Sequence, residues 1–186
     1  MNAGPRLKPI PYEDWDFDAL AEISPGIKPP EINVVAFFAH HPELARKFLD
    51  WNHWVNGRKT SALPRQVREI AILRVSWLRR ARYEWAQHLK SARRAGVDDD
   101  TISAIRSEKK VSGVAGLIVT TVDELTGSSR VSDATYAALA AEFDERQRIE
   151  LVFLIGTYSL LSMAFNTFGV ELDPGLDDEN FDERNT

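Results

Sequence analysis

The chain has 186 residues, of which 44% are hydrophobic, and a formal net charge of −5 at pH 7. This length suits one domain or two small ones with a real hydrophobic core, and the charge excludes the basic surface expected of a nucleic-acid-binding protein. The sequence contains no cysteine, which excludes disulfides, thiolate catalysis and cysteine-ligated metals and fits a cytoplasmic enzyme.

Both ends of the chain differ in composition from its middle. Residues 1–30 contain six prolines, and proline lacks a backbone donor and disfavours helix in the residue before it. We therefore predict an extended N-terminal arm with one short helix around residues 15–22, and no apolar core of a secretion signal. Residues 171–186 carry a charge of −6 and are interpreted as a solvated acidic tail.

Residues 31–170 show helical periodicity and no alternating strand pattern. Pro42 is placed to open a helix that runs through about Val55. The next helix, at about residues 64–80, is apolar on nearly all sides and is expected in the middle of the fold. Further helices are predicted at residues 83–94, 98–106, 113–126, 132–141 and 144–168. The sequence thus predicts an all-α domain of six to eight helices with short connections.

The longest apolar stretch, residues 151–168, is interrupted by glycine and polar side chains. It is interpreted as a buried helix, too short and too polar to cross a membrane. Tyr158 and Asn166 interrupt it, either as satisfied polar groups of the core or as the lining of a pocket. His40, His41 and His53 have no partners at metal-ligand spacing, and no metal site is expected.

Three ionisable side chains stand out in the two helices at residues 64–80 and 83–94. Glu84 and His88 are four residues apart and share a helix face, which is the arrangement of a general acid or base with its orienting carboxylate. By spacing alone, an ordinary surface pair is the commoner outcome. Glu69 lies on the more buried helix, where a glutamate needs a partner. It either pairs with a neighbouring arginine, Arg65 or Arg68, or faces His88 across the helix pair.

Three further residues are candidates for substrate binding. Arg74 interrupts the apolar helix, where it either clamps an anionic group through two hydrogen bonds or forms an ion pair between helices or subunits. Tyr83 and Trp85 flank Glu84, and aromatic residues at such positions more often form the core or a pocket wall. A Tyr83 hydroxyl would also be able to donate a hydrogen bond to a substrate.

Two segments, residues 63–74 and Tyr83-Glu84-Trp85-Ala86-Gln87-His88, resemble the carboxymuconolactone decarboxylase family, which also contains alkylhydroperoxidase D. In the peroxidase branch, cysteines stand four and seven residues before the histidine, where this chain has Glu84 and Ala81. The resemblance covers about residues 31–170. It implies an alkylhydroperoxidase D-like helical bundle and a homo-oligomer, commonly a trimer or a hexamer.

The resemblance also implies a function: a cofactor-free lyase of aromatic compound catabolism that acts on a small carboxylated lactone or a related acid. His88 would donate the proton or stabilise charge, and Glu69 or Glu84 would orient it. The substrate would be bound by Arg74, Tyr83 and Trp85. Neither a nucleic acid nor a membrane is an expected partner, and no metal or other cofactor is needed.

Two other functions remain open. The family label carries peroxidase activity, which the missing cysteines oppose because a dithiol reduces the peroxide. A non-catalytic oligomeric binding protein would keep the helical core but would not need Glu69, Glu84 and His88 together.

Overall fold

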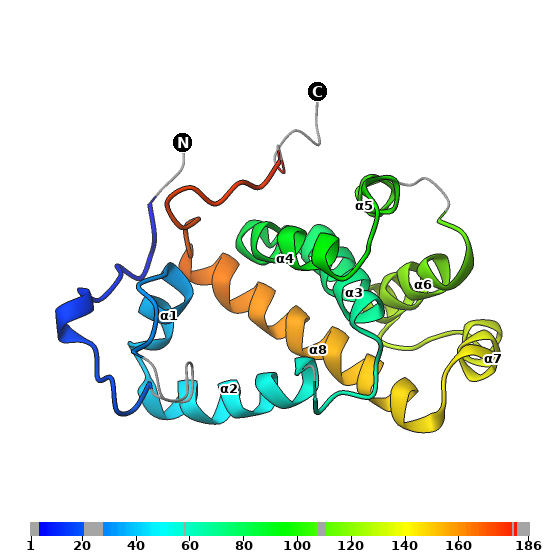
Figure 1. The fold of residues 1–186 in the computed structure, drawn as a ribbon, viewed down its shortest axis with the longest axis horizontal. Helices are drawn as coiled ribbons and strands as arrows, with labels where there is room; N and C mark the ends of the chain where they lie inside the picture. Colours follow the sequence, from blue (N-terminus) through cyan, green and yellow to red (C-terminus); the bar gives the residue numbers. More distant parts are fainter. Residues whose placement is uncertain (1–3, 21–27, 58, 108–110, 180, 182–186) are drawn as a thin grey trace.

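Helices make up all the regular structure among the residues described by the computed structural model, which are 4–20, 28–57, 59–107, 111–179 and 181 (Figure 1). The elements in chain order are the 3-10 helix η1 (Tyr12–Asp14) and the α-helices α1 (Asn33–Phe38), α2 (Pro42–Asn56), α3 (Arg65–Leu78), α4 (Arg82–Arg94), α5 (Asp99–Ile105), α6 (Gly113–Ser128), α7 (Asp133–Glu142) and α8 (Glu145–Phe168). The all-α prediction and the number of helices are confirmed.

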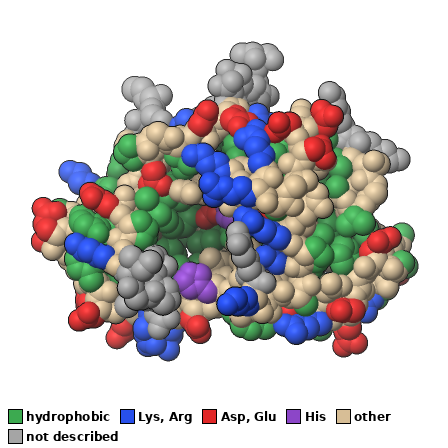
Figure 2. Space-filling model, in the orientation of Figure 1, with side chains coloured by type: hydrophobic (Ala, Val, Ile, Leu, Met, Phe, Trp, Pro, Cys, Tyr) green, Lys and Arg blue, Asp and Glu red, His purple; other side chains and the backbone are tan. Residues whose placement is uncertain are grey.

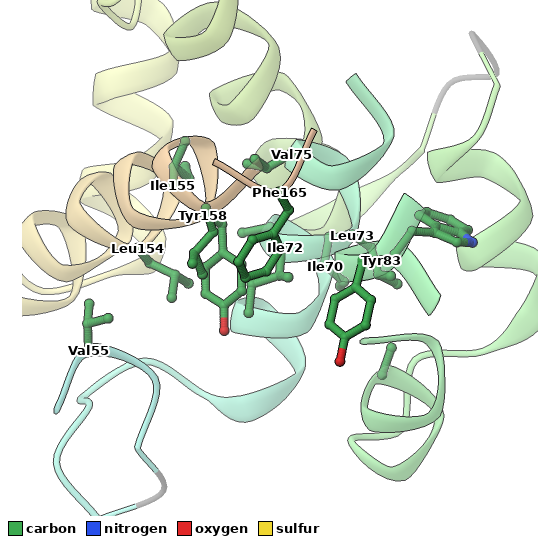
Figure 3. Packing of buried hydrophobic residues seen from close by; sticks show 14 of the residues in the cluster. Val55, Ile70, Ile72, Leu73, Val75, Tyr83, Leu154, Ile155, Tyr158 and Phe165 are labelled. Atoms are coloured by element: carbon green, nitrogen blue, oxygen red, sulfur yellow. The ribbon is translucent and has the colours of Figure 1, made fainter. Parts of the chain in front are cut away.

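Helix α3 lies at the centre of the fold and packs against α4, α5, α6 and α8. Its aliphatic side chains are buried on several sides, as its all-round apolar pattern predicts. In Figure 1, α8 runs diagonally through the middle of the molecule between α2 and α4. Figure 3 shows Tyr158 and Phe165 of α8 beside Ile72 of α3. Helix α8 therefore supports the central helix α3.

For the seven helices predicted between residues 42 and 168, the limits agree with the structure to within two residues, and local side chains cap several of the ends. Asp98 and Ser132 accept hydrogen bonds from the first turns of α5 and α7. Asp144 and Gln147 form a reciprocal capping box at the start of α8. At the other end of α8, Gly169 adopts a φ of 73°, a left-handed conformation that glycine reaches without strain.

The N-terminal arm differs from its prediction. Instead of a helix around residues 15–22, the structure has η1 and a turn over residues 17–20, and residues 21–22 lie outside the described part. Trp15 donates its indole N–H to the Ile10 carbonyl (2.9 Å) and packs edge-to-face on Tyr12. These contacts turn the chain back on itself. The Trp15 indole thereby obtains its hydrogen bond and its ring contact without a helix.

The C-terminal segment also differs from its prediction as a solvated acidic run. Among its described residues, Asp178 and Phe181 are buried. Asp178 forms an ion pair with Arg82, and Glu179 accepts two hydrogen bonds from Arg93, of 2.5 and 3.0 Å. The acidic side chains of this segment therefore bind it to arginines of α4 rather than leaving it in water.

Helix α8 is longer than the apolar stretch suggested. With 24 residues it is long and apolar enough to cross a membrane by length and composition, which corrects the expectation that it is too short and too polar. A core helix of a soluble protein passes the same test. One side of α8, including Leu151, Leu154, Tyr158, Leu161 and Phe165, is buried against the rest of the fold, so its packing is that of a core helix.

Candidate active site

Adjacent helices bring three ionisable side chains together at the centre of the molecule. Glu69 comes from α3, and Glu84 and His88 come from α4, which packs along α3. Both glutamates are only 5% exposed, and 14% of the His88 side chain is exposed. Burying two carboxylates and an imidazole lowers the stability of the fold unless these groups pair with one another or with other polar groups.

His88 contacts both carboxylates, one at each ring nitrogen. Its Nδ1 lies 2.8 Å from Oε2 of Glu69, the length of a charge-assisted hydrogen bond. Its Nε2 lies 3.6 Å from Oε2 of Glu84, which is too long for a good hydrogen bond. The sequence left open which glutamate pairs with His88. In the structure Glu69 binds and orients the ring, while Glu84 stands at the other nitrogen.

The pKa values of Glu84 and His88 are both displaced upward. Burial raises the pKa of Glu84 to about 7, although the nearby charge of His88 opposes the shift. Burial by itself would lower the pKa of His88, but the hydrogen bond and charge of Glu69, together with the charge of Glu84, outweigh it and raise the pKa above its ordinary value. Each group therefore keeps its proton to a higher pH than it would in water, which suits acid–base chemistry.

A hydrogen-bond chain ends at Tyr158, whose ring lies edge-on to His88 with 5.1 Å between the ring centroids. Arg68 Nε donates to Oδ1 of Asn56 (3.2 Å), and Nδ2 of Asn56 donates to the hydroxyl oxygen of Tyr158 (2.7 Å). Because a guanidinium has only donors, Arg68 fixes which end of the Asn56 amide faces Tyr158. The tyrosine oxygen is thus an acceptor in this chain, and its own proton has no acceptor among the described residues.

Tyr158 remains a neutral phenol. Burial, followed by the charges of Glu84 and Glu69, raises its pKa well above the ordinary value. Figure 3 shows its hydroxyl pointing away from the labelled aliphatic side chains around its ring. The group is therefore available as a hydrogen-bond donor rather than as a base.

The face of the molecule seen in Figure 2 is hollowed between α2 and α4. Hydrophobic side chains line much of the hollow, and acidic and histidine side chains are visible at its bottom. His40, His41 and His53 are exposed at the surface, whereas His88 is half-buried. Because 14% of the His88 side chain is exposed, a small molecule can reach the imidazole.

Arg74, predicted as a substrate-binding residue, lies on the side of α3 that faces α6. Its guanidinium donates to both oxygens of Asp123 (2.6 and 2.9 Å) and to the Ile105 carbonyl (2.6 Å). This is the inter-helix ion pair that the sequence left as the alternative. Arg65 instead lies beside the site, with Nε 3.9 Å from Oε1 of Glu69 and a partly exposed side chain.

Tyr83 and Trp85 are buried and bind the C-terminal segment. The Tyr83 hydroxyl donates to Asp173 Oδ2 (2.8 Å), and the Trp85 indole donates to the Asp178 carbonyl (3.2 Å). The donor that Tyr83 was expected to offer to a substrate is occupied by Asp173. Among the described residues, no group of three or more histidine, cysteine or carboxylate side chains has the arrangement of a metal site.

Asn56 and Arg68 carried no functional signal in the sequence. Asn56 is the last residue of α2 and binds Tyr158, 102 residues away in the chain, and Arg68, one residue before Glu69, binds Asn56. Tyr158 itself was recognised as a polar interruption of an apolar helix. That interruption is the one sequence signal for this part of the site.

Comparison with known proteins supports the family resemblance. The sequence profile of the carboxymuconolactone decarboxylase family matches residues 42–113, a segment that contains Glu69, Glu84 and His88. No curated protein has a sequence that matches this chain.

Two solved structures have the same fold. One is an alkylhydroperoxidase AhpD core, an uncharacterized peroxidase-related protein from Ralstonia eutropha JMP134, with a TM-score of 0.76 and 16% identity over 97% of this chain and 96% of that chain. The other is an uncharacterized peroxidase-related protein from Silicibacter sp. TM1040, with a TM-score of 0.71 and 16% identity over 96% of this chain and 94% of that chain. At this identity the likeness establishes the fold alone, and it confirms the predicted AhpD-like architecture.

Proposed function

We propose that this protein, a cysteine-free member of the carboxymuconolactone decarboxylase family through residues 42–113, is a cofactor-free enzyme that decarboxylates a small carboxylated lactone by acid–base chemistry. The observation that carries the proposal is the imidazole of His88 held between two buried carboxylates, Glu69 at Nδ1 and Glu84 at Nε2. The proposal places the enzyme in the cytoplasm, with a small acidic substrate as its ligand.

The reaction needs two things from the protein. As the bond to the carboxylate carbon breaks, CO2 leaves and the electron pair moves through the conjugated ring into the lactone carbonyl, whose oxygen becomes negative. A ring carbon then takes a proton. The site must therefore offer a hydrogen-bond donor where the oxygen gains charge and an acid near the carbon.

His88 supplies the acid. The Glu69 carboxylate accepts the proton on Nδ1, which fixes the ring and stabilises the imidazolium, in the role that an orienting carboxylate has beside other catalytic histidines. The proton on Nε2 is then the one delivered to carbon. Glu84, with its pKa raised to about 7, is placed to return a proton to Nε2 after each turnover. It occupies a position that holds a cysteine in the peroxidase branch of the family.

Tyr158 supplies the donor to the developing oxyanion. Its oxygen already accepts from Asn56, so its O–H is free to point at a ligand oxygen, and the chain from Arg68 polarises it. Such a preorganised donor costs no reorganisation when the charge forms. Since the phenol is next to His88, one bound lactone can contact both groups.

Arg65 is proposed to bind a carboxylate of the substrate, the role first assigned to Arg74. The Arg65 side chain is 29% exposed, and its Nε lies 3.9 Å from Oε1 of Glu69, a loose ion pair that does not prevent the guanidinium from binding a second carboxylate. Arg74 is fully engaged by Asp123 and Ile105, so a substrate would have to break those bonds. A guanidinium suits a carboxylate because its donors match both oxygens.

The peroxidase alternative is favoured by the names of the two similar structures, which call them peroxidase-related. At 16% identity the likeness to these structures establishes a shared fold and does not establish a shared reaction. Cysteine-based peroxide reduction passes through a dithiol, and this chain has no cysteine. At one of the two cysteine positions it has Glu84 in contact with His88, which favours proton transfer.

The test is turnover of 4-carboxymuconolactone, followed by the loss of its ultraviolet absorbance, with wild type, His88→Ala and His53→Ala. His53 is an exposed histidine of α2 and serves as the matched control. We expect wild type and His53→Ala to consume the substrate and His88→Ala to be slower by about 10²–10⁴-fold. Equal rates for all three would remove His88 from the mechanism, and an inactive wild type would exclude this lactone as the substrate.

A further inference from the structure

The outward side of α8 is apolar, although a surface helix normally turns charged side chains toward water. Its five large hydrophobic side chains there are each 46–55% exposed. They and one exposed glycine follow at helical spacings along a single side of the helix. We call this set the α8 stripe: Ile149, Val152, Phe153, Gly156, Leu160 and Met163.

The α8 stripe carries no charge. From Ile149 to Phe168 the sequence has one ionisable acid, Glu150, and that side chain is buried. Two half-exposed tryptophans of α2 widen the apolar surface, since Trp51 packs edge-to-face on Phe153 (5.7 Å between ring centroids) and stacks on Trp54 (5.8 Å). Connected apolar surfaces of this kind mark interaction sites more often than isolated exposed residues do.

The stripe is symmetric about Gly156. Val152 and Leu160 lie four residues on either side of it, and Ile149 and Met163 lie seven residues on either side. A Cβ added at Gly156 would meet nothing within 4 Å, so the backbone there is open to close approach by another helix. Two copies of α8 packed antiparallel around a two-fold axis at Gly156 would place Val152 against Leu160 of the other copy, and Ile149 against Met163.

We propose that the α8 stripe binds the same stripe of a second copy of this chain, antiparallel and around a two-fold axis at Gly156. An isologous contact of this kind needs one self-complementary surface, and the stripe is self-complementary in both spacing and polarity. The stripe lies on the side of α8 opposite the buried Tyr158. The proposal therefore stands apart from the proposed function.

The size of the surface agrees with a dimer contact. With about half of each side chain exposed and about 100–200 Å² of surface per large side chain, the stripe and the two tryptophans offer on the order of 500 Å². A standard interface takes about 800 Å² from each partner, including a polar rim. The stripe would then form the apolar centre of such an interface.

A lipid surface is a poorer occupant. Helices that lie on membranes carry lysine and arginine on their other side, facing anionic headgroups. The other side of α8 is packed in the protein core, and the chain as a whole has a net charge of −5, which anionic membranes repel. We therefore expect no membrane binding through the stripe, and the experiment below measures it.

The test is the mass of the full chain by sedimentation equilibrium for wild type, Gly156→Leu and Leu44→Lys. Leu44 is a 54% exposed leucine of α2 outside the stripe and serves as the matched control for a surface change. We expect wild type and Leu44→Lys to form particles of two, or an even number, of 21.0 kDa chains. Gly156→Leu, at an exposed position where an added Cβ meets nothing within 4 Å in the same chain, favours helix and should lose the contact.

The register is tested by charge pairs. Each single variant, Val152→Glu or Leu160→Lys, would bury an unpaired charge in the contact. Either one should therefore dissociate the dimer. The double variant V152E/L160K places the new carboxylate of one copy opposite the new ammonium of the other and should restore association. A double variant that stays dissociated overturns the antiparallel register.

Three other outcomes overturn the proposal as a whole. These are a monomeric wild type, a wild-type particle that Gly156→Leu leaves unchanged, and stripe-dependent binding of monomeric protein to phosphatidylglycerol vesicles.

Discussion

Glu84 and His88 lie one helical turn apart on α4, with 3.6 Å between the carboxylate Oε2 and the imidazole Nε2. The two groups have no fixed hydrogen bond between them. A small movement of either side chain would bring them close enough to exchange a proton. Burial raises the pKa of Glu84 to about 7, and the carboxylates raise that of His88, so the two groups titrate as a coupled pair.

The first prediction concerns stability against pH. The folded-state pKa of Glu84 is raised, so its contribution to stability is present below the unfolded pKa of 4.5 and is lost as the pH rises through about 7. The wild-type free energy of unfolding should therefore fall between pH 5 and pH 8, by up to about 3 kcal/mol from this group. Glu84→Gln has no such group to ionise, and its stability should fall less over this range.

Urea unfolding at pH 5, 6, 7 and 8 measures this difference. Glu142→Gln, at an exposed position at the end of α7, is the matched control and should follow the wild-type curve. If the wild type and Glu84→Gln lose the same stability between pH 5 and pH 8, then Glu84 does not titrate in this range.

The second prediction concerns Glu69. Its hydrogen bond and charge help to raise the pKa of His88 against the effect of burial, so Glu69→Gln should lower that pKa. Proton NMR of the histidine rings across pH measures it, with the His88 resonance assigned by its loss in His88→Ala. Turnover should fall by about 10²-fold or more, because the imidazolium loses its partner. An unchanged pKa in Glu69→Gln would contradict the role given to this hydrogen bond.

The third prediction concerns the oxygen-binding role of Tyr158. Tyr158→Phe keeps the ring that packs on His88 and removes only the O–H. We expect kcat to fall by about 10²–10³-fold, with KM nearly unchanged, because the donor acts where charge develops. Circular dichroism should show the fold intact.

Asn56→Ala distinguishes a polarising chain from simple packing. Asn56 acts on the reaction through Tyr158, so the double variant Y158F/N56A should be no slower than Tyr158→Phe alone. Independent contributions to kcat from the two residues would show that Asn56 does not act through the tyrosine hydroxyl.

Part of the fold and of the site could be predicted from the sequence. Helix limits are set by local caps such as Asp98 and Asp144, which are visible in the sequence. Periodicity placed Glu69, Glu84 and His88 on two consecutive helices, but it left open which of the two glutamates pairs with His88, because that depends on how the helices pack. The family resemblance marked Glu69 and His88 as functional positions without deciding that they bind each other.

The rest depended on contacts between distant parts of the chain. Helix α1 was not predicted because its first N–H is bound by Asp173, 140 residues later. The sequence left open whether Arg74 binds a substrate or another helix, because its partner Asp123 lies 49 residues away. An arginine in an apolar helix must have an anionic partner, and the sequence does not say whether that partner is a substrate or another helix.

The fourth prediction separates these two arginines. Arg74→Ala leaves Asp123 and the Ile105 carbonyl without their donor, so the protein should lose about 2 kcal/mol of stability while kcat/KM of the folded enzyme stays unchanged. Arg65→Ala should lose little stability, because its ion pair with Glu69 is long and partly exposed, but should raise KM about tenfold or more. Urea unfolding and initial rates measure the two effects. The reverse pattern would return the substrate-binding role to Arg74.

The last prediction concerns the C-terminal segment, which holds α4 from outside. Phe181 is 2% exposed and packs edge-to-face on Trp77 with 5.3 Å between ring centroids, and against Trp85 with 5.7 Å. Phe181→Ala removes this anchor and should lower the free energy of unfolding by about 3 kcal/mol or more. Phe168→Ala, at a 39% exposed position, is the control and should cost far less.

The change at Phe181 should reach the active site through α4. Trp85 follows Glu84 directly, and its indole is bound to the Asp178 carbonyl. Releasing the segment therefore loosens the helix that positions Glu84 and His88. Urea unfolding, tryptophan fluorescence and turnover should all change together in Phe181→Ala, with fluorescence reporting solvent entry around Trp77 and Trp85. If stability falls while turnover of the folded fraction is unchanged, the segment stabilises the fold without positioning the site.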